Sequence, residues 1–331
     1  MNDFRTALTP RSSTFPLNLK DKIFTIGSCF ADEIGSHLIE DKFAVSNNPF
    51  GTVYNPVSIH QLLYYSLFNI FPSKDGYSQN GDIYFHYNFH SSFSSLNADE
   101  LKKKIKHSIT SSNLFLENSN YLIMTYGTAF VYFLTRQDVV VANCHKMPSS
   151  NFKKMLLTEE QVVRSFKEFY QQLKSELPSI KIILTVSPVR HLKDTLELNS
   201  VSKSILRTAC HTITDRFKDV EYFPAYEIML DDLRDYRFYK TDRLHPTEEA
   251  VEYIWKKFNE AYFDESTKKF VSEWEKVKSD INHKSFHQLS ETHQKFLKIL
   301  LNKLEALNAT IDVSNEIQNV KNQINRAVRT Q

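Results

Sequence analysis

The stretch Lys22–Leu38, KIFTIGSCFADEIGSHL, predicts a strand, a sharp turn and a helix in succession. The apolar run Ile23–Ile26 has the length and β-rich composition of a buried strand, and the residues after Ser28 are typical of a helix. Ser28 would then lie at the carboxyl edge of a sheet, where the first amide groups of the helix have no intrahelical partner. A hydroxyl in that place is suited to act as a nucleophile, and the simpler alternative is that Ser28 only caps the helix.

A second polar group comes more than two hundred residues later, in Lys240–Pro246, KTDRLHP. Asp242 precedes His245 by three residues, so its carboxylate can fold back and accept the Nδ1 proton of the imidazole. Nε2 is then free to take a proton from a hydroxyl. Because Asp-x-x-His is common by chance, the pair gains weight only together with the Gly27–Ser28 turn.

Strand and helix patterns alternate along most of the chain, which predicts a three-layer α/β/α fold with a central parallel sheet. After the first strand, the expected strands are Phe43–Ser46, Asn120–Tyr126, Ile182–Val186 and Val220–Ala225. The expected helices are Val57–Leu67, one capped by Asn97, one capped by Thr158 and Gln161, Leu198–Phe217 and Thr247–Tyr262.

Two segments interrupt this alternation. Phe130–Leu134 and Asp138–Ala142 predict a hairpin, and Phe68–Leu96 is an irregular region rich in aromatic residues. Those aromatic side chains either line a substrate groove or pack a long insertion over the sheet. Ligands of parallel sheets bind beyond the carboxyl ends of the strands. The residues that fall at or after strand ends are Ser28, Gly51, Gly127, Ser187 and the Asp242 loop.

The turn Gly27–Ala31, GSCFA, resembles the signature of the GSCFA family, which belongs with the SGNH, or GDSL-like, hydrolases. Further segments are similar to that family over about residues 20 to 300: Asn48–Pro56, Tyr126–Phe130, Asn143–Lys146 and Ser187–Asp194. The resemblance implies an SGNH-like fold with flavodoxin-like strand order and a Ser28–His245–Asp242 triad. It also implies hydrolysis or transfer of O-acyl esters, with carbohydrate esters as the substrate class common among the relatives.

The resemblance further implies an oxyanion site formed by the backbone amides of Ser28 and Gly51. The superfamily takes its third donor from the asparagine of a Gly-x-Asn motif, but this sequence has Gly127-Thr128-Ala129, so the pattern fails there. Thr128 and Asn143 are both candidates for the missing donor.

Four further residues are candidates for substrate binding: Asn48, Gly127, His145 and His191. For the two histidines, a hydrogen-bonded structural role is the alternative. The alternative function is a non-catalytic or weakly catalytic protein that uses the same fold to bind a ligand or partner.

Composition adds several expectations. The net charge is +2, from 41 basic and 39 acidic side chains, which gives no general attraction to nucleic acid. Cys29, Cys144 and Cys210 do not form a disulfide pattern. Cys29 is an alternative nucleophile, but the family resemblance implies serine at the turn, and the next residue of a helix start would point elsewhere. A zinc site of Cys29, Cys144 and His145 lacks supporting spacing, so no metal or cofactor is expected. Without a secretion signal or a long apolar run, the sequence predicts a cytoplasmic protein with no membrane span.

The pattern changes after Phe263, because proline, glycine and strand-like runs all disappear. We therefore predict a hydrolase-like domain at 1–263 and a helical extension at 264–331. The extension carries an apolar seam with one single-residue slip: Leu297, Leu300, Leu304, Leu307 and Ile311, then Val313, Ile317, Val320, Ile324 and Ala327. This seam would pack on the same chain, on a second copy in a homodimer, or on another partner.

Overall fold

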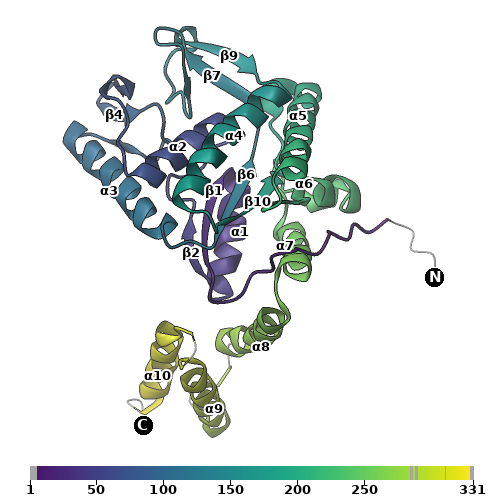
Figure 1. Ribbon diagram of the computed structural model, residues 1–331. Helices are drawn as coiled ribbons and strands as arrows, with labels where there is room; N and C mark the ends of the chain where they lie inside the picture. The colour runs from purple at the N-terminus through teal and green to yellow at the C-terminus, as the bar shows by residue number, and fades with distance from the viewer. Residues whose placement is uncertain (1–5, 284–285, 288–289, 310, 329–331) are drawn as a thin grey trace. The chain divides into compact units, whose positions relative to one another are not determined.

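The computed structural model describes residues 6–283, 286–287, 290–309 and 311–328, of which the side chains of residues 194 and 326–328 are excluded (Figure 1). Ala327 of the predicted seam is thus outside the described side chains. The chain divides into two compact units. One comprises Lys20–Ile39, Phe43–Tyr262 and the segment that ends at Pro16. The other comprises Leu17–Leu19, Glu40–Lys42 and the segment that begins at Phe263.

Five parallel strands form the central sheet of the first unit, in the order β11-β10-β6-β1-β2. They are β1 (Lys22–Gly27), β2 (Ala44–Asn47), β6 (Tyr121–Tyr126), β10 (Lys181–Val186) and β11 (Val220–Phe223). Counted along the chain, this is the order 2-1-3-4-5, so the predicted flavodoxin-like parallel sheet is confirmed. Thr125 pairs with both Gly27 and Thr185, so three neighbouring strands end at the same level.

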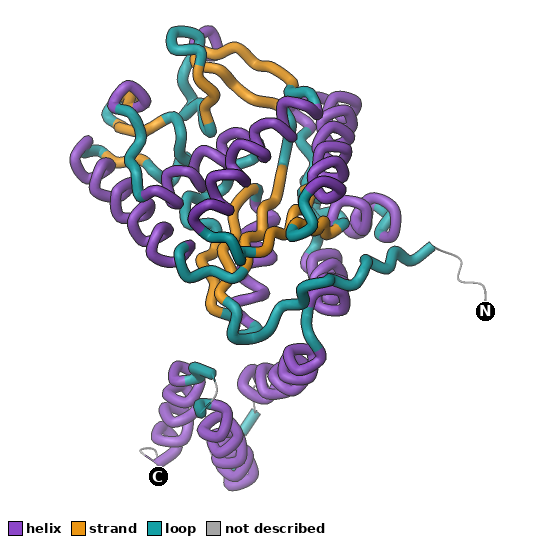
Figure 2. The backbone as a smooth tube through the Cα atoms, in the orientation of Figure 1, coloured by secondary structure: helices purple, strands orange, loops and turns teal. Residues whose placement is uncertain are grey.

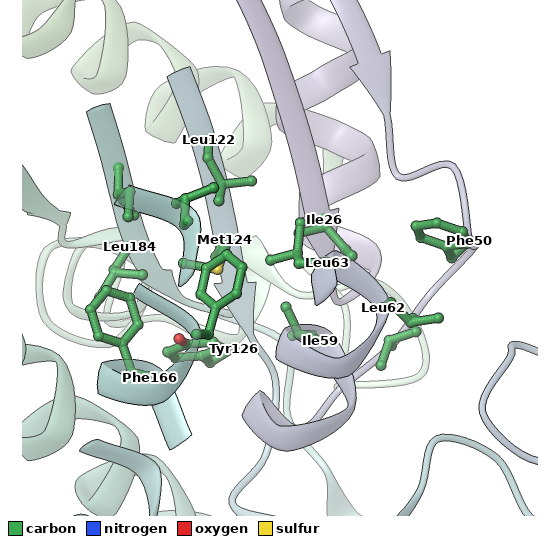
Figure 3. Close-up of a cluster of buried hydrophobic side chains, with 14 of the residues drawn as sticks. Ile26, Phe50, Ile59, Leu62, Leu63, Leu122, Met124, Tyr126, Phe166 and Leu184 are labelled. Carbon is green, nitrogen blue, oxygen red and sulfur yellow. The ribbon is translucent and has the colours of Figure 1, made fainter. Parts of the chain in front are cut away.

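Helices cover both faces of this sheet (Figure 2). One face carries α2 (Pro56–Phe68), α3 (Ala98–Leu116), α4 (Glu159–Glu176) and α5 (Thr195–Arg216), and the other carries α1 (Cys29–Glu40) and α7 (Glu248–Tyr262). Alternate strand residues point to opposite faces, and Ile26 and Met124 pack with α2 in the larger core (Figure 3). On the other face, the rings of Phe223 and Phe258 lie 5.1 Å apart. The three-layer prediction is therefore confirmed.

Two small antiparallel sheets occupy the segments that interrupt the alternation. They are β3 (Tyr77–Asn80), β4 (Ile83–His86) and β5 (Ser94–Ser95), and β8 (Val139–Val141), β7 (Phe130–Leu134) and β9 (Phe152–Leu156). The predicted hairpin is β7–β8, whereas β3, β4, β5 and β9 were not predicted because these short strands lack a clear apolar alternation. Phe85, Tyr87, Phe89 and Phe93 are buried, which favours the packing role for the aromatic region.

Short helical turns complete the first unit: η1 (Lys74–Gly76), η2 (Ser149–Asn151), η3 (Leu192–Asp194), α6 (Ala225–Glu227), η4 (Ile228–Asp232) and η5 (Tyr236–Phe238). The predicted helix caps are present. Thr158 and Gln161 exchange hydrogen bonds in a capping box, and the Asn97 side chain accepts the amides of the first turn of α3. No described helix has both the length and the apolar content that a membrane span requires.

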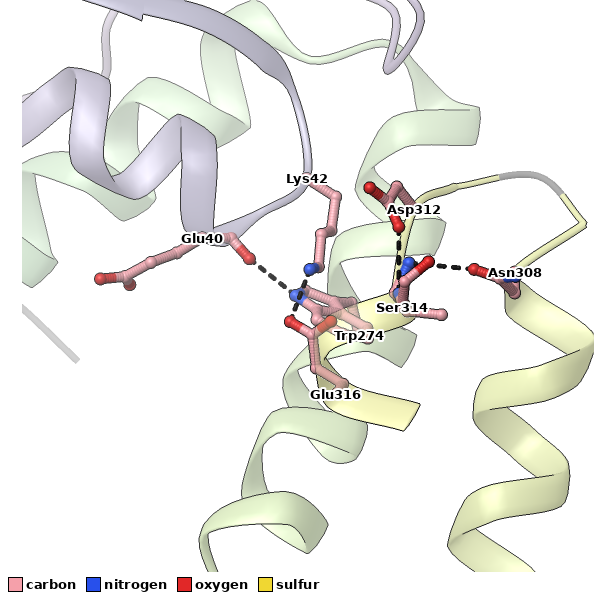
Figure 4. Close-up of polar contacts among 8 residues, drawn as sticks. Glu40, Lys42, Trp274, Asn308, Asp312, Ser314 and Glu316 are labelled. Atoms are coloured by element: carbon pink, nitrogen blue, oxygen red, sulfur yellow. Dashed lines mark hydrogen bonds and ion pairs between the residues drawn. The ribbon is translucent and has the colours of Figure 1, made fainter. Parts of the chain in front are cut away.

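The second unit contains α8 (Glu265–Asn282), α9 (Glu291–Leu307) and α10 (Ser314–Val328). The described seam residues of α9 and α10 pack against Trp274 and Val277 of α8. Trp274 Nε1 donates to the carbonyl oxygen of Glu40 at 2.7 Å, and Lys42 pairs with Glu316 at 2.6 Å (Figure 4). The single-residue slip corresponds to the turn between α9 and α10, where Asn308 Oδ1 accepts the Val313 amide. Binding of a second copy or another partner by these helices stays a prediction.

His60 of α2 is expected to make the first unit less stable in acid. Its ring is buried, with Nδ1 2.8 Å from Ser165 Oγ and Nε2 2.7 Å from Tyr126 Oη. Burial lowers the pKa of His60 to about 3. The unfolded chain, with an ordinary histidine pKa of about 6.5, takes up the proton first. The titration of His60 therefore leaves the free energy of unfolding unchanged above about pH 6.5. As the pH falls from there toward 3, it lowers the free energy of unfolding by at most about 1.4 kcal/mol per pH unit.

We expect a His60→Phe variant to be less stable at pH 7, because two hydroxyl groups lose their partner, and to show a shallower loss of stability between pH 6.5 and 4.5. Urea unfolding of both proteins at several pH values measures this slope. Burial also lowers the pKa of His86 to about 4, so part of the slope remains. Equal slopes in the two proteins would contradict the assignment.

Candidate active site

The turn from β1 into α1 is tightly constrained by its neighbours. Gly27 has a φ of +141°, and a Cβ atom there would lie 2.2 Å from the carbonyl oxygen of Thr125. The Ser28 amide donates to that same oxygen at 3.0 Å. The Ser28 side chain is fully buried, and its Oγ accepts the Phe30 amide at 3.3 Å. In this structure Ser28 thus caps α1 at the carboxyl edge of the sheet, which is the simpler of the two roles considered from sequence.

The loop before α7 holds Asp242 and His245 as a pair. Asp242 Oδ2 lies 2.6 Å from His245 Nδ1, and Oδ1 accepts the backbone amides of Leu244 and His245 at 2.8 and 3.1 Å. These hydrogen bonds, of which the one from the Leu244 amide has the largest effect, hold the pKa of Asp242 well below its usual range. Arg243 adopts a left-handed φ of 60°, which closes the loop. Asp242 is thus an anionic acceptor for Nδ1, while Nε2 has no hydrogen-bond partner among the described residues.

One backbone contact places this loop at the same sheet edge as Ser28. The Arg190 amide, four residues beyond the end of β10, donates to the carbonyl oxygen of Leu244 at 3.2 Å. His191 also lies close enough for His245 to affect its titration. However, no hydrogen bond joins Ser28 Oγ to His245 within the described part of the chain. Ser28 is fully buried, whereas the Asp242 and His245 side chains are each 43% exposed.

A family model described as the GSCFA family matches residues 22–258, which include both the Ser28 turn and the Asp242–His245 loop. The chain belongs to the GSCFA family. A second model, described as a GSCFA domain protein C-terminal domain, matches residues 274–326 of the helical unit. A comparison with curated proteins finds no match.

Solved structures with a related fold are distant from this GSCFA protein. A family 3 carbohydrate esterase of Clostridium thermocellum is 11% identical, with a TM-score of 0.33 over 73% of this chain and 94% of that one. A family 3 carbohydrate esterase of Talaromyces cellulolyticus is 6% identical, with a TM-score of 0.35 over 76% and 99% of the two chains. At this level of similarity, the activity of those proteins does not transfer to this one.

The amides predicted to form an oxyanion site are occupied in the GSCFA protein. The Ser28 amide donates to Thr125, the Gly51 amide donates to the Asn48 carbonyl oxygen at 2.8 Å, and the Thr128 amide donates to Tyr54 at 3.1 Å. Thr128 Oγ1 lies 3.0 Å from Ser202 Oγ. An oxyanion role for any of these amides would require it to exchange its present acceptor.

Asn143, the other candidate donor, lies in a different part of the unit. Its Oδ1 accepts the His145 amide at 2.8 Å, and its own amide donates to the carbonyl oxygen of Tyr87. Its hydrogen bonds therefore run to the small antiparallel sheets, and none reaches the Ser28 turn.

Asn48 and Gly127, two of the predicted substrate contacts, support the turn. The buried Asn48 side chain accepts the Gly27 amide at 3.1 Å and donates to the Gly27 carbonyl oxygen at 3.4 Å. The Gly127 amide donates to Tyr54 at 2.7 Å, and a Cβ atom on Gly127 would lie 3.1 Å from the Tyr54 ring. Both residues therefore fix the backbone around Ser28.

The two predicted histidines have different environments. His145 stacks on Phe85 with ring centroids 4.2 Å apart, and its Nε2 lies 3.1 Å from the carbonyl oxygens of His86 and Phe89. These contacts fit the structural alternative. His191 meets the Tyr54 ring edge-on at 5.2 Å, and its buried Nε2 has no hydrogen-bond partner among the described residues. Burial has the largest effect on the pKa of His191, and Lys203 and His245 have smaller effects in the same direction. Together they lower its pKa to about 3, which keeps the ring neutral.

The cysteine alternatives gain no support from their surroundings. Burial, followed by the Asp32 carboxylate, raises the pKa of the Cys29 thiol, so the reactive thiolate is disfavoured. Burial likewise raises the pKa of Cys144. Within the described ranges, no group of three or more His, Cys, Asp or Glu side chains is arranged to hold a metal ion.

A cavity of about 230 Å³ is lined by Tyr239, which precedes the Asp242 loop, and by Arg190, whose amide donates to Leu244 of that loop. Its walls are mainly apolar and aromatic, with a few polar groups: Pro188, Arg190, Leu196, Asn199, Ser200, Tyr226, Met229, Leu230 and Tyr239. The Arg190 guanidinium stacks 3.9 Å from the centroid of the Tyr239 ring. An apolar cavity with a small number of polar groups is typical of small-molecule sites.

Sequence reasoning missed Lys203, whose Nζ donates to the carbonyl oxygens of Gly127 and Ser187 at the ends of β6 and β10. The buried residues of α5 include Ser202, Lys203, Leu206, Ala209, Cys210 and Ile213. The available signal was the position of Lys203 on a helix stripe whose other members are buried. Lysine is almost never fully buried without a partner, so this position indicated an unusual role.

Proposed function

We propose that this GSCFA protein is a serine esterase that uses Ser28 as nucleophile, His245 as general base and Asp242 to orient the imidazole. The observation that supports it most is the 2.6 Å contact between Asp242 Oδ2 and His245 Nδ1. The hydrogen bond from Arg190 to Leu244 connects the loop of this pair to the carboxyl edge of the sheet, and Ser28 follows the end of β1 at the same edge. Together these features support a nucleophile–base–carboxylate arrangement as the proposed site.

In the proposed reaction, Ser28 Oγ leaves its long contact with the Phe30 amide and turns toward His245 Nε2. The oxygen attacks the ester carbonyl carbon as its proton passes to Nε2, and the carbonyl electron pair moves onto oxygen. When the tetrahedral intermediate collapses, the leaving alcohol takes that proton and the acyl group stays on Ser28. Water, or an acceptor hydroxyl, then releases the acyl group by the reverse sequence.

The proposed substrate is an O-acyl ester of a small molecule, with carbohydrate esters as the first class to examine. The cavity beside Arg190 would hold one part of it, because Tyr226 and Tyr239 offer ring surface and Asn199 offers polar groups. The proposed reaction needs no metal or cofactor.

A fluorophosphonate probe tests the nucleophile directly. We expect it to label the wild-type protein and to label Ser28→Ala at least a thousandfold more slowly, with a parallel loss of p-nitrophenyl acetate hydrolysis. Ser36→Ala, at an exposed serine of the same helix, and Cys29→Ala are the matched controls and should retain labelling. Labelling of Ser28→Ala at the wild-type rate would contradict the proposal.

A ligand-binding protein without catalysis is the second candidate function, and specific observations favour it. Ser28 is fully buried, it has no hydrogen bond to His245 among the described residues, and the amides around it are occupied. A folded wild-type protein that is never labelled by the probe would favour this candidate over the esterase.

A further inference from the structure

Lys203 is a buried cation at the carboxyl edge of the central sheet. Its side chain is 1% exposed, and Nζ lies 2.7 Å from each of its two carbonyl acceptors, on Gly127 and Ser187. No carboxylate pairs with it in the described part of the chain. Removing an ammonium group from water costs more than hydrogen bonds to neutral acceptors return. A lysine kept in such a place without a carboxylate partner is therefore a candidate functional group.

Lys203 lies close to the Ser28 turn, because Gly127, which accepts a hydrogen bond from Nζ, comes two residues after Thr125, which accepts the Ser28 amide. Cys29, the residue after Ser28, interacts electrostatically with Lys203, and so does His191. The Tyr226 ring centroid lies 5.9 Å from Nζ. The N-terminal end of α1, a helix of twelve residues, adds a partial positive charge at the same place. Asp32 and Glu33 act on the Cys29 thiol, and Glu227 and Asp231 act on the Tyr226 side.

Lys203 has an unused hydrogen-bond donor, whereas the neighbouring backbone amides of Ser28 and Gly51 are already occupied. Lys203 carries three N–H groups, and two of them are used by Gly127 and Ser187. The third has no hydrogen-bond partner among the residues described. The amides of Ser28 and Gly51, by contrast, already donate to carbonyl oxygens. Unlike the amides of Ser28 and Gly51, Lys203 therefore has an N–H group left to meet new negative charge near Ser28.

We propose that the Lys203 ammonium group stabilises the oxyanion that forms when Ser28 attacks an ester, an inference that rests on the proposed esterase function. As the Oγ–C bond forms, the carbonyl electron pair moves to oxygen, and the positive charge of Lys203 offsets the new negative charge. The charge returns to the carbonyl bond when the alcohol leaves. Lys203 neither gains nor loses a proton in this cycle.

This role gives the reaction a distinctive pH dependence. Burial lowers the pKa of Lys203 to about 7, so the ammonium group is lost as the pH rises through that value. The role of Lys203 as a cation therefore predicts that kcat/KM falls on the alkaline side. A role as a neutral base toward Ser28 would predict the opposite, because the uncharged amine would become more abundant.

The experiment compares wild type, Lys203→Met and Lys203→Arg by p-nitrophenyl acetate hydrolysis and fluorophosphonate labelling between pH 5 and 9. We expect Lys203→Met to react about 100-fold to 1000-fold more slowly. Lys203→Arg should keep more activity and lose the alkaline fall, because arginine stays charged throughout this range. Lys167→Met, at an exposed lysine of α4, is the matched control and should behave as wild type.

Three outcomes would overturn the inference. One is a folded Lys203→Met protein with wild-type rates, and another is a Lys203→Arg profile that keeps the alkaline fall. The third is wild-type activity that rises with pH through 7 when that rise is absent from Lys203→Met. If Lys203→Met does not fold, the Lys203→Arg profile decides. In each case Ser28→Ala separates the two proposals: labelling that depends on Ser28 but not on Lys203 removes only the role of Lys203.

Discussion

Under the proposed esterase function, replacing Asp242 with asparagine is expected to lower kcat for ester hydrolysis about 10⁴-fold while the protein stays folded, the magnitude seen when a triad carboxylate becomes an amide. The carboxylate favours the tautomer of a neutral His245 ring in which Nδ1 carries the proton and Nε2 is free to accept one. An amide can instead donate to Nδ1, and the proton of the ring then moves to Nε2, where it blocks proton transfer from Ser28. The side-chain carbonyl oxygen of the introduced asparagine can still accept the amides of Leu244 and His245, so the loop should keep its shape.

Asp235→Asn is the matched control for this prediction. Asp235 also accepts a backbone amide two residues on, that of Arg237 at 2.9 Å, but it contacts no histidine among the described residues. We expect this variant to keep wild-type kcat. Steady-state kinetics for both variants, with circular dichroism to check folding, make the comparison. Equal activities of Asp242→Asn and wild type would show that Asp242 does not orient a catalytic base.

Replacing Gly27 with alanine is expected to destabilise the first unit by about 4 kcal/mol or to prevent its folding. Two costs combine at this position. The φ of +141° is strained for any residue with a side chain, and the new Cβ would lie 2.2 Å from the Thr125 carbonyl oxygen. That oxygen is a backbone atom of the central strand β6, so it cannot move aside cheaply. Because it also accepts the Ser28 amide, any shift would displace Ser28 as well.

Gly81→Ala separates the two costs at Gly27. Gly81 also has a positive φ, of 62°, but a Cβ atom there would meet nothing within 4 Å. We expect this variant to lose only about 1 kcal/mol, from backbone conformation alone. Denaturant unfolding of the three proteins gives the difference. A Gly27→Ala protein as stable as Gly81→Ala would mean that the turn has room to relax.

Most of the central architecture could be predicted from short stretches of sequence. The buried strand before Gly27, the capping box at Thr158 and the run Asn120–Tyr126 each carry a local signal, because strand periodicity and helix capping depend on residues only a few positions apart. The same is true of the contact between Asp242 and His245, which spans three residues. The α9–α10 turn also left a local trace, the slip in the apolar seam.

The surroundings of Ser28 were decided by residues far apart in the chain. Thr125 accepts the hydrogen bond of the Ser28 amide, and Asn48 accepts that of the Gly27 amide. Lys203 donates to the carbonyl oxygens of Gly127 and Ser187. Hydrogen-bond partners at such separations follow from how strands and helices are brought together, and a local pattern does not encode them. The residue pattern by itself therefore determined the layered parallel sheet, the turn at Ser28 and the Asp-x-x-His loop, while the strand order came from the family resemblance. Only the tertiary structure decided which amides are occupied and which buried cation lies at the edge of the sheet.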